Sequence, residues 1–189
     1  MDLTVLDDVD KKLIKLLQED GRKSLVSIGR DLGISHVSVK KRLEKLLSEG
    51  IISIEALIAS KMFVYAIVIA ELEGYEYFEE VKNRLEHCPR MIFLAPLIGG
   101  INLIAIMAFE DMNVLESCMT SCFLKSLKGV KRSEVLIARK LFVPTHISLK
   151  AKRMDREYTP CGTHCGSCIL YKESKCPGCP ATRYYKGYI

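Results

Sequence analysis

The sequence predicts an α+β protein in three parts: a winged-type helix-turn-helix, a ferredoxin-like βαββαβ domain and a small cysteine-rich tail. Two short amphipathic segments meet at a glycine within residues 24–52. Strand-like and helix-like apolar segments alternate within residues 62–148. Five of the eight cysteines then lie between residues 161 and 179. The expected domain boundaries are 1–52, 53–61 (a linker strand), 62–148 and 149–189.

Residues 24–52 are predicted to fold as two helices across a tight turn. Apolar residues of the first helix recur at the spacing of one helix face, at Leu25, Ile28 and Leu32. Gly33 ends this helix, because glycine adopts the left-handed cap conformation at no steric cost. Ser35 can cap the helix that follows. That helix ends at Gly50, and a further helix over about 7–19 packs on the pair.

The second helix of this pair has a polar and mainly basic outer face. In a helix-turn-helix the second helix enters the major groove of double-stranded DNA. There Lys and Arg contact phosphate or guanine, and short polar side chains reach base edges. The candidate DNA-contacting residues are Ser35, His36, Ser38, Lys40, Lys41, Arg42 and Lys45.

Composition narrows the class of protein further. The chain has 189 residues, of which 49% are hydrophobic, so it can bury a substantial core. No apolar run reaches the length that crosses a membrane. The first ten residues are acidic and lack the basic and apolar regions of a signal peptide. We expect a cytoplasmic protein without a membrane partner.

The middle region predicts a sheet with two helices in the order β-α-β-β-α-β. Near-continuous apolar runs predict strands at 62–73, 91–97, 101–110 and 130–144, and amphipathic patterns predict helices at about 78–88 and 115–122. These strands do not alternate apolar with polar residues, so both faces of the sheet should be covered. We expect the helices on one face and the sheet of a second copy, in a two-fold homodimer, on the other.

The first fifty residues resemble a known family. LDDVDKKLIKLLQEDGRKSL, followed by SIGRDLGIS and VKKRLEKLLSEGII, is similar to the DNA-binding domain of the Lrp/AsnC family of archaeal and bacterial regulators. Gly29 stands where that family usually has alanine. The resemblance implies a sequence-specific transcription regulator that forms dimers or larger even assemblies, and not an enzyme. Siroheme decarboxylases share this outline and are the alternative from a different functional class.

The resemblance also implies a place for a small-molecule effector. In the family, effectors bind near a Gly-x-Tyr-Asp-like motif between the second and third strands of the ferredoxin-like domain. The matching residues here are Gly99, Gly100 and Asn102. Asn102 replaces an acidic residue that could pair with an amino group, and a plain hairpin turn is the alternative for the two glycines.

The tail has the cysteine spacing of a metal site. Its candidate ligands are Cys161, Cys165, Cys168, Cys176 and Cys179. Two cysteines separated by two residues let one turn direct both sulfurs at one ion, and two such pairs supply the four thiolates of a structural zinc site. We therefore expect a tail stapled by zinc. The first three cysteines also resemble runs that hold an iron–sulfur cluster, and disulfides are a third alternative.

Two further expectations concern the tail and the other cysteines. A metal could be purely structural, or its binding or redox state could order and release the tail and so modulate DNA affinity. His164 lies among the tail cysteines and could replace one of them as a ligand. Cys88, Cys118 and Cys122 fall on apolar helix faces and are expected to be ordinary buried residues.

Overall fold

The computed structural model describes residues 6–121, 128–149 and 155–187. The chain forms two compact units, Met1–Ala56 and Leu57–Ile189, each with its own core. Within the described residues, no helix combines the length and the apolar character needed to cross a membrane.

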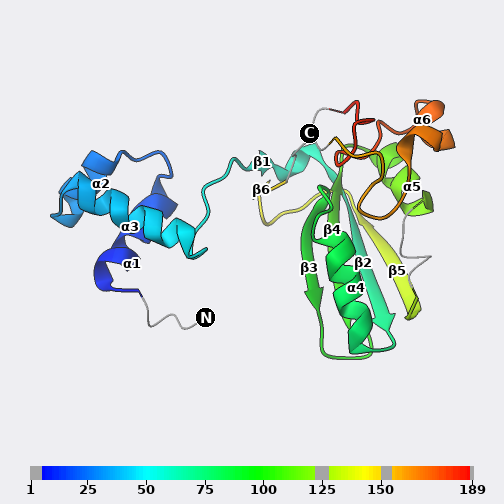
Figure 1. Ribbon diagram of the computed structural model, residues 1–189, viewed down its shortest axis with the longest axis horizontal. Coiled ribbons are helices and arrows are strands. Elements are labelled where there is room, and N and C mark those ends of the chain that lie inside the picture. The colour runs from blue at the N-terminus through cyan, green and yellow to red at the C-terminus, as the bar shows by residue number, and fades with distance from the viewer. Residues whose placement is uncertain (1–5, 122–127, 150–154, 188–189) are drawn as a thin grey trace. The chain divides into compact units, whose positions relative to one another are not determined.

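The first unit consists of three helices (Figure 1): α1 Asp8–Glu19, α2 Leu25–Leu32 and α3 His36–Ser48. Between residues 6 and 56 there is no strand, so the prediction of a winged type is wrong. The predicted linker strand shrinks to β1, Ile58–Ala59. The physical reason lies just after α3: the backbone N–H of Ile51 donates to the carbonyl oxygen of Leu46 at 2.9 Å, and Ile51 and Ile52 pack back on the helical core.

The turn between α2 and α3 follows the predicted local rules. Gly33 has φ 70°, in the left-handed region, and the Ser35 hydroxyl accepts a hydrogen bond from the backbone N–H of Ser38 at 3.1 Å. Gly29 is required by close approach, because an added Cβ would lie 2.7 Å from the carbonyl oxygen of Ile34. The interior beneath this turn is formed by Leu13, Ile28, Val39 and Leu46.

The second unit contains the predicted βαββαβ arrangement. Its elements are β2 Val64–Leu72, α4 Tyr75–Leu85, β3 Met91–Pro96, β4 Leu103–Phe109, α5 Met112–Ser121 and β5 Val130–Ala138. The sheet order is β3-β4-β2-β5, and every neighbouring pair is antiparallel. The last strand ends at Ala138, earlier than predicted, and the chain then pairs His146–Ile147 (β6) with β1.

Both helices cover the same face of this sheet. Val68 and Ala70 of β2 pack with Val81 of α4, and Ala66 of β2 packs with Leu115 of α5. The side chains of Ile67, Ile69, Ile104, Ile106, Phe93 and Leu136 belong to the opposite face by register, and all are partly or fully exposed. The strands lack alternation because this second face is also apolar.

The tail packs on the ferredoxin-like domain and has little regular structure. It contains a 3₁₀ turn at Cys165–Ser167, the short helix α6 at Ile169–Lys172 and an isolated bridge between Tyr158 and His164. Even so, Ala181 and Thr182 are fully buried. The tail is therefore part of the same compact unit as the ferredoxin-like domain.

Candidate functional site

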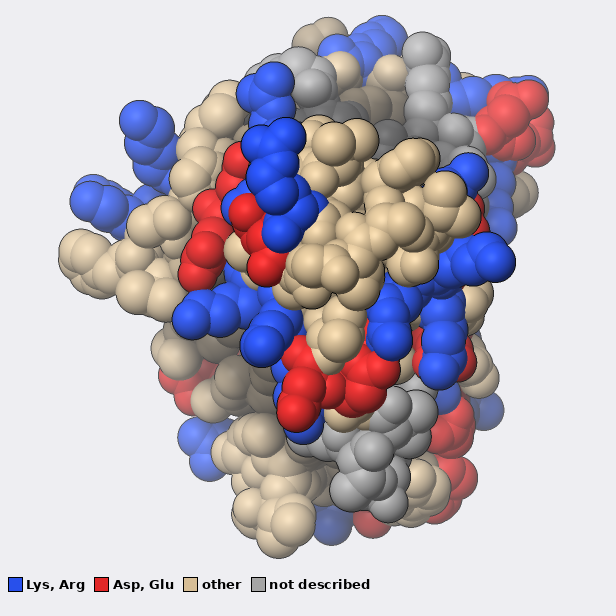
Figure 2. Space-filling model, turned by 90° about the vertical axis from the view of Figure 1, so that its left-hand side faces the viewer, with Lys and Arg blue, Asp and Glu red and all other residues tan. Residues whose placement is uncertain are grey.

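Helix α3 presents an exposed polar surface at its start and along one side. The candidate residues Ser35, His36, Ser38, Lys40, Lys41 and Lys45 are all exposed. Lys40 lies 3.7 Å from Glu44 and Lys45 lies 4.0 Å from Glu49, in exposed ion pairs that contribute little and separate readily. Viewed from the side of the helical unit, basic and acidic side chains are interspersed instead of forming one basic patch (Figure 2).

Arg42, predicted to contact DNA, is paired with two carboxylates of α1 and its N-cap in this structure. Its Nη1 donates to Asp7 Oδ2 and to Asp10 Oδ1, both at 2.7 Å. Asp10 is buried, and Asp7 caps the start of α1 by accepting a hydrogen bond from the Asp10 backbone N–H at 2.8 Å. That backbone hydrogen bond, followed by the one from Arg42, lowers the pKa of Asp7. Arg42 thus connects α3 to α1.

Replacing Arg42 with alanine is expected to loosen α1. Its loss leaves the buried Asp10 carboxylate without its cation, so we expect amide exchange in α1 of the intact protein to accelerate by about 5–30-fold. Lys40→Ala is the matched control, because it removes only an exposed pair and should change exchange by about twofold or less. Equal exchange in the two variants would show that Arg42 has no such role.

The predicted effector residues lie at the loop between β3 and β4, but Asn102 is engaged in the fold. Its Oδ1 accepts from the backbone N–H of Leu72 at 2.8 Å, and its Nδ2 donates to the Leu72 carbonyl oxygen at 3.0 Å. The side chain therefore joins the end of β2 to the start of β4. Gly99 and Gly100 are exposed, and Gly99 has φ 150°, which favours glycine.

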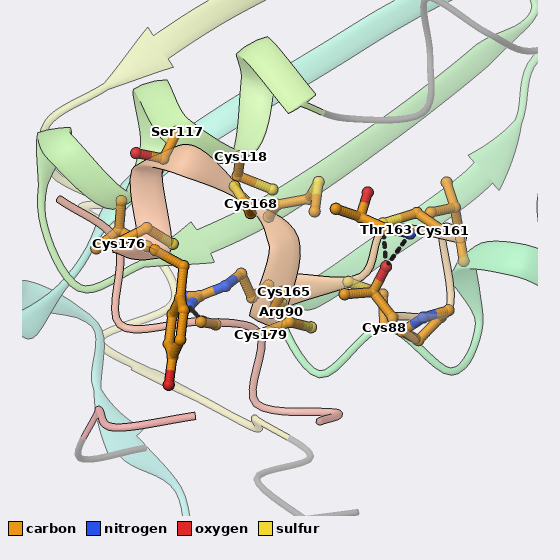
Figure 3. A pocket seen from close by; sticks show the side chains of 17 residues that line it. Cys88, Arg90, Ser117, Cys118, Cys161, Thr163, Cys165, Cys168, Cys176 and Cys179 are labelled. Carbon is orange, nitrogen blue, oxygen red and sulfur yellow. Dashed lines mark hydrogen bonds between the residues drawn. The ribbon is translucent and has the colours of Figure 1, made fainter. Parts of the chain in front are cut away.

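Seven cysteines line one cavity of about 80 Å³ in the second unit (Figure 3). They are Cys88, Cys118, Cys161, Cys165, Cys168, Cys176 and Cys179. No disulfide joins these seven cysteines to one another. Cys88 and Cys118 pack against the apolar core, as predicted, and both also line the cavity with the tail cysteines. Cys122 lies outside the described residues.

The structure does not bring these cysteines to a single point. Within residues 6–121, 128–149 and 155–187, no three Cys, His, Asp or Glu side chains lie close enough together to hold one metal ion. His164 is occupied elsewhere: its Nδ1 accepts from the Ser167 backbone N–H at 3.1 Å, and its Nε2 lies 3.1 Å from the Tyr184 hydroxyl. The arrangement is a cavity with sulfur on its walls.

Arg90, which lines this cavity, forms a buried ion pair with Glu110 that the sequence did not reveal. Arg90 and Glu110 are each 4% exposed in their side chains and form a bidentate pair, with 3.1 Å between Arg90 Nη2 and Glu110 Oε1. Glu110 also accepts from the Tyr185 hydroxyl at 2.7 Å, and Arg90 lies 3.5 Å from the Gly178 carbonyl oxygen. The pair therefore attaches the tail to the sheet.

The surroundings of the cavity raise the pKa of three of the thiols that line it. Burial is the main cause that raises the pKa of Cys88 and that of Cys176. Burial likewise raises the pKa of Cys179 to about 12, with smaller contributions from Cys88 and Cys165. Arg90 acts in the opposite direction on the pKa of each of these three thiols. A metal that binds here must displace protons.

Comparisons with known proteins bear mainly on the first unit and on the general fold. Residues 6–47 match the model of the AsnC-type helix-turn-helix domain. The chain is 32% identical over 115 residues to the HTH-type transcriptional regulator Ptr1 of Methanocaldococcus jannaschii, covering 59% of this chain and 77% of that protein. It is 30% identical over 135 residues to an HTH-type transcriptional regulator of Pyrococcus horikoshii, PH0140, covering 70% of this chain and 85% of that one.

A solved structure has the same general fold. The transcriptional regulator NMB0573 of Neisseria meningitidis, in complex with L-Met, superposes with a TM-score of 0.60 at 23% identity, over 74% of this chain and 94% of that chain. Each of these matches leaves at least a quarter of this chain without a counterpart. The proteins compared are transcriptional regulators and not enzymes.

Proposed function

Because the chain belongs to the Lrp/AsnC family of DNA-binding transcriptional regulators, we propose that it binds a two-fold symmetric operator as a dimer, with α3 in the major groove. The single observation that carries this proposal is the Ser35-capped helix α3, with its exposed polar start and its exposed lysines. Half-sites about one helical turn apart would match the symmetry of such a dimer.

The exposed residues at the start and along the side of α3 form two groups, one placed to contact bases and one placed to contact phosphates. His36 and Ser38 lie in the first turn of the helix, the end that contacts base edges in this motif. Lys40, Lys41 and Lys45 follow along the helix and suit phosphate contacts, which set position and affinity but carry no sequence information. Arg42 is left out of this set because Asp7 and Asp10 hold its guanidinium.

The open face of the sheet supports the homodimer. The apolar side chains of Ile67, Ile104, Ile106 and Leu136 share this face. Helices α4 and α5 cover the other face. Residues around β1 and β6 cover the end of this face at Tyr65 and Ala108, and the rest of it carries the exposed apolar side chains. A second copy of the same sheet would cover these side chains and complete a two-fold interface.

A small-molecule effector near Gly99 and Gly100 is a further part of the proposal. A protein of the same fold was crystallised with L-methionine, which supports small-molecule sensing by this architecture. The exposed Gly99 and Gly100 allow close approach to the backbone. Asn102 would act only indirectly, because its amide binds Leu72.

Lys41 provides a test of the DNA contact. No ion pair of Lys41 is found in the part of the chain that the structure describes, so its charge is available to phosphate. Lys41→Ala should weaken binding to an operator selected from random duplexes and to a shuffled duplex by the same factor. The slope of log K against log salt should fall in magnitude by about 1. Fluorescence anisotropy titrations over a salt series measure both quantities.

Lys12→Ala is the control for this experiment. Lys12 is exposed on α1, so its loss changes net charge equally without altering α3. If Lys12→Ala and Lys41→Ala have the same effect, α3 is not the element in the groove. If Lys41→Ala instead reduces the preference for the selected operator, Lys41 reads a base.

A further inference from the structure

The arrangement of the cysteines bears on the kind of metal centre that fits the cavity. Four thiolates on one zinc ion, at about 2.3 Å each in a tetrahedron, lie only about 3.8 Å from one another. No such convergence is found among the described residues, where the sulfurs surround a space instead. In an iron–sulfur cluster, iron and sulfide atoms occupy the space between the thiolates, which therefore stay further apart.

The size of the cavity agrees with a group larger than one ion. A single water needs about 10–15 Å³ of such volume. The cavity measures about 80 Å³, so it offers room for several atoms. Its remaining walls are largely apolar, with Leu85, Met107 and Val114 among them. A compact inorganic core with thiolate ligands suits this space better than a hydrated ion does.

The paired spacing of the tail cysteines selects four of the seven. Cys165 and Cys168 come from one turn of the tail, and Cys176 and Cys179 come from another. In Figure 3, Cys176 is drawn at one side of the cavity and Cys88 and Cys161 at the other, with Cys165, Cys168 and Cys179 between them. Cys161 stands outside these two pairs, and its sulfur lies 3.0 Å from the Thr159 hydroxyl.

The domain contributes a positive charge to the same cavity. Four thiolates around a cluster give the site a net negative charge. Arg90 lines the cavity, and its guanidinium lies 3.5 Å from the carbonyl oxygen of Gly178, next to Cys179. The guanidinium of Arg90 therefore places a positive charge from the ferredoxin-like domain next to the negatively charged centre. Arg90 directly precedes β3 of the sheet whose open face is proposed to form the dimer.

We propose that this cavity holds an iron–sulfur cluster ligated by Cys165, Cys168, Cys176 and Cys179, and that the cluster fixes the tail on the ferredoxin-like domain beside Arg90. Each thiol releases its proton to solvent as it binds iron. The cluster core comes from sulfide and from ferric and ferrous iron supplied to the apoprotein, so the ferric iron of the core is supplied as such and no further oxidant is needed. The centre would thus join the tail to the domain that forms the dimer, independently of whether α3 binds DNA.

Metal analysis of the full-length protein tests the proposal. Protein purified without air, and apoprotein reconstituted with ferric and ferrous iron and sulfide, should contain two or four irons per chain with an equal amount of acid-labile sulfide, and should absorb broadly in the visible. One zinc per chain without sulfide would overturn the cluster in favour of a structural zinc site. Protein that takes up neither metal would overturn the metal centre altogether.

Two variants test the ligand set. The double variant Cys165→Ser, Cys176→Ser removes one ligand from each pair and should lose essentially all iron and sulfide. Cys88→Ser is the matched control, because this cysteine lines the same cavity outside the proposed set, and it should keep the full iron content. Loss of iron from Cys88→Ser, or its retention in the double variant, would overturn the assignment of ligands.

Proteolysis tests whether the cluster fixes the tail. Lys172, Lys175 and Arg183 are exposed trypsin sites within the tail. Cleavage after these residues, followed by mass spectrometry, should be at least about tenfold slower in the reconstituted protein than in the apoprotein, because proteolysis follows the population of the opened state. Equal cleavage rates would overturn the clamping role.

Discussion

Glu110→Ala is expected to destabilise the second unit by about 3–5 kcal/mol, the cost of leaving a buried charge without its partner. Arg90 and Glu110 are each only 4% exposed in their side chains, so water cannot replace the lost carboxylate. The substitution also removes the acceptor of the Tyr185 hydroxyl. The tail should therefore loosen together with the sheet. Amide exchange of β4 and of residues 176–187 measures both effects in the intact protein.

Two further variants separate the charge from the tail contact. Tyr185→Phe removes one hydrogen bond to a charged group and should cost about 1.5–3 kcal/mol, with faster exchange mainly in the tail. Arg90→Met combined with Glu110→Leu removes both charges and should recover much of the stability lost in Glu110→Ala. A cost below about 1 kcal/mol for Glu110→Ala would contradict a buried pair.

The helix-turn-helix could be predicted because its determinants are local. The Gly33 cap, the Ser35 cap and the apolar spacing of α2 are each set by residues within a few positions of one another. The role of Arg42 could not be predicted in this way, because its partners lie 35 and 32 residues away along the chain. An exposed basic residue and a basic residue paired to another helix follow the same sequence pattern.

The order of the ferredoxin-like elements could also be predicted, but the cysteine cavity could not. Cys88 follows α4 and Cys118 lies on α5, at positions that pack on the apolar core. An apolar helix position predicts burial without indicating which distant segment lies against it. Arg90 was missed for a similar reason, since its buried partner Glu110 is brought near only by the pairing of β3 with β4. The cysteine spacing within the tail indicated a metal site, but it did not indicate that Cys88, Arg90 and Cys118 of the ferredoxin-like domain line the same cavity.

Leu136→Asp is expected to convert the proposed dimer into a monomer. Leu136 is 45% exposed on the open face of the sheet, opposite Ile67, so a carboxylate there is tolerated by the folded monomer. In the dimer the same carboxylate would be buried among apolar side chains without a partner, which is strongly unfavourable. Light scattering coupled to size exclusion measures the change in mass.

The effect on DNA binding should be larger than that of any single α3 lysine. A dimer that binds two half-sites gains about 10²–10⁴-fold in affinity over a single helix-turn-helix unit. Leu136→Asp should lose this gain on a selected duplex that carries two half-sites. Its affinity for a duplex with a single half-site should be unchanged.

Val135→Asp is the matched control: Val135 is 40% exposed but points to the other face of the strand, opposite Val68. Because successive side chains of a strand face opposite sides, the two variants place the same charge one residue apart and differ only in face. A dimer that survives Leu136→Asp, or one that is lost equally in both variants, would contradict assembly through the open sheet and would require a different origin for the two-fold symmetry of the operator.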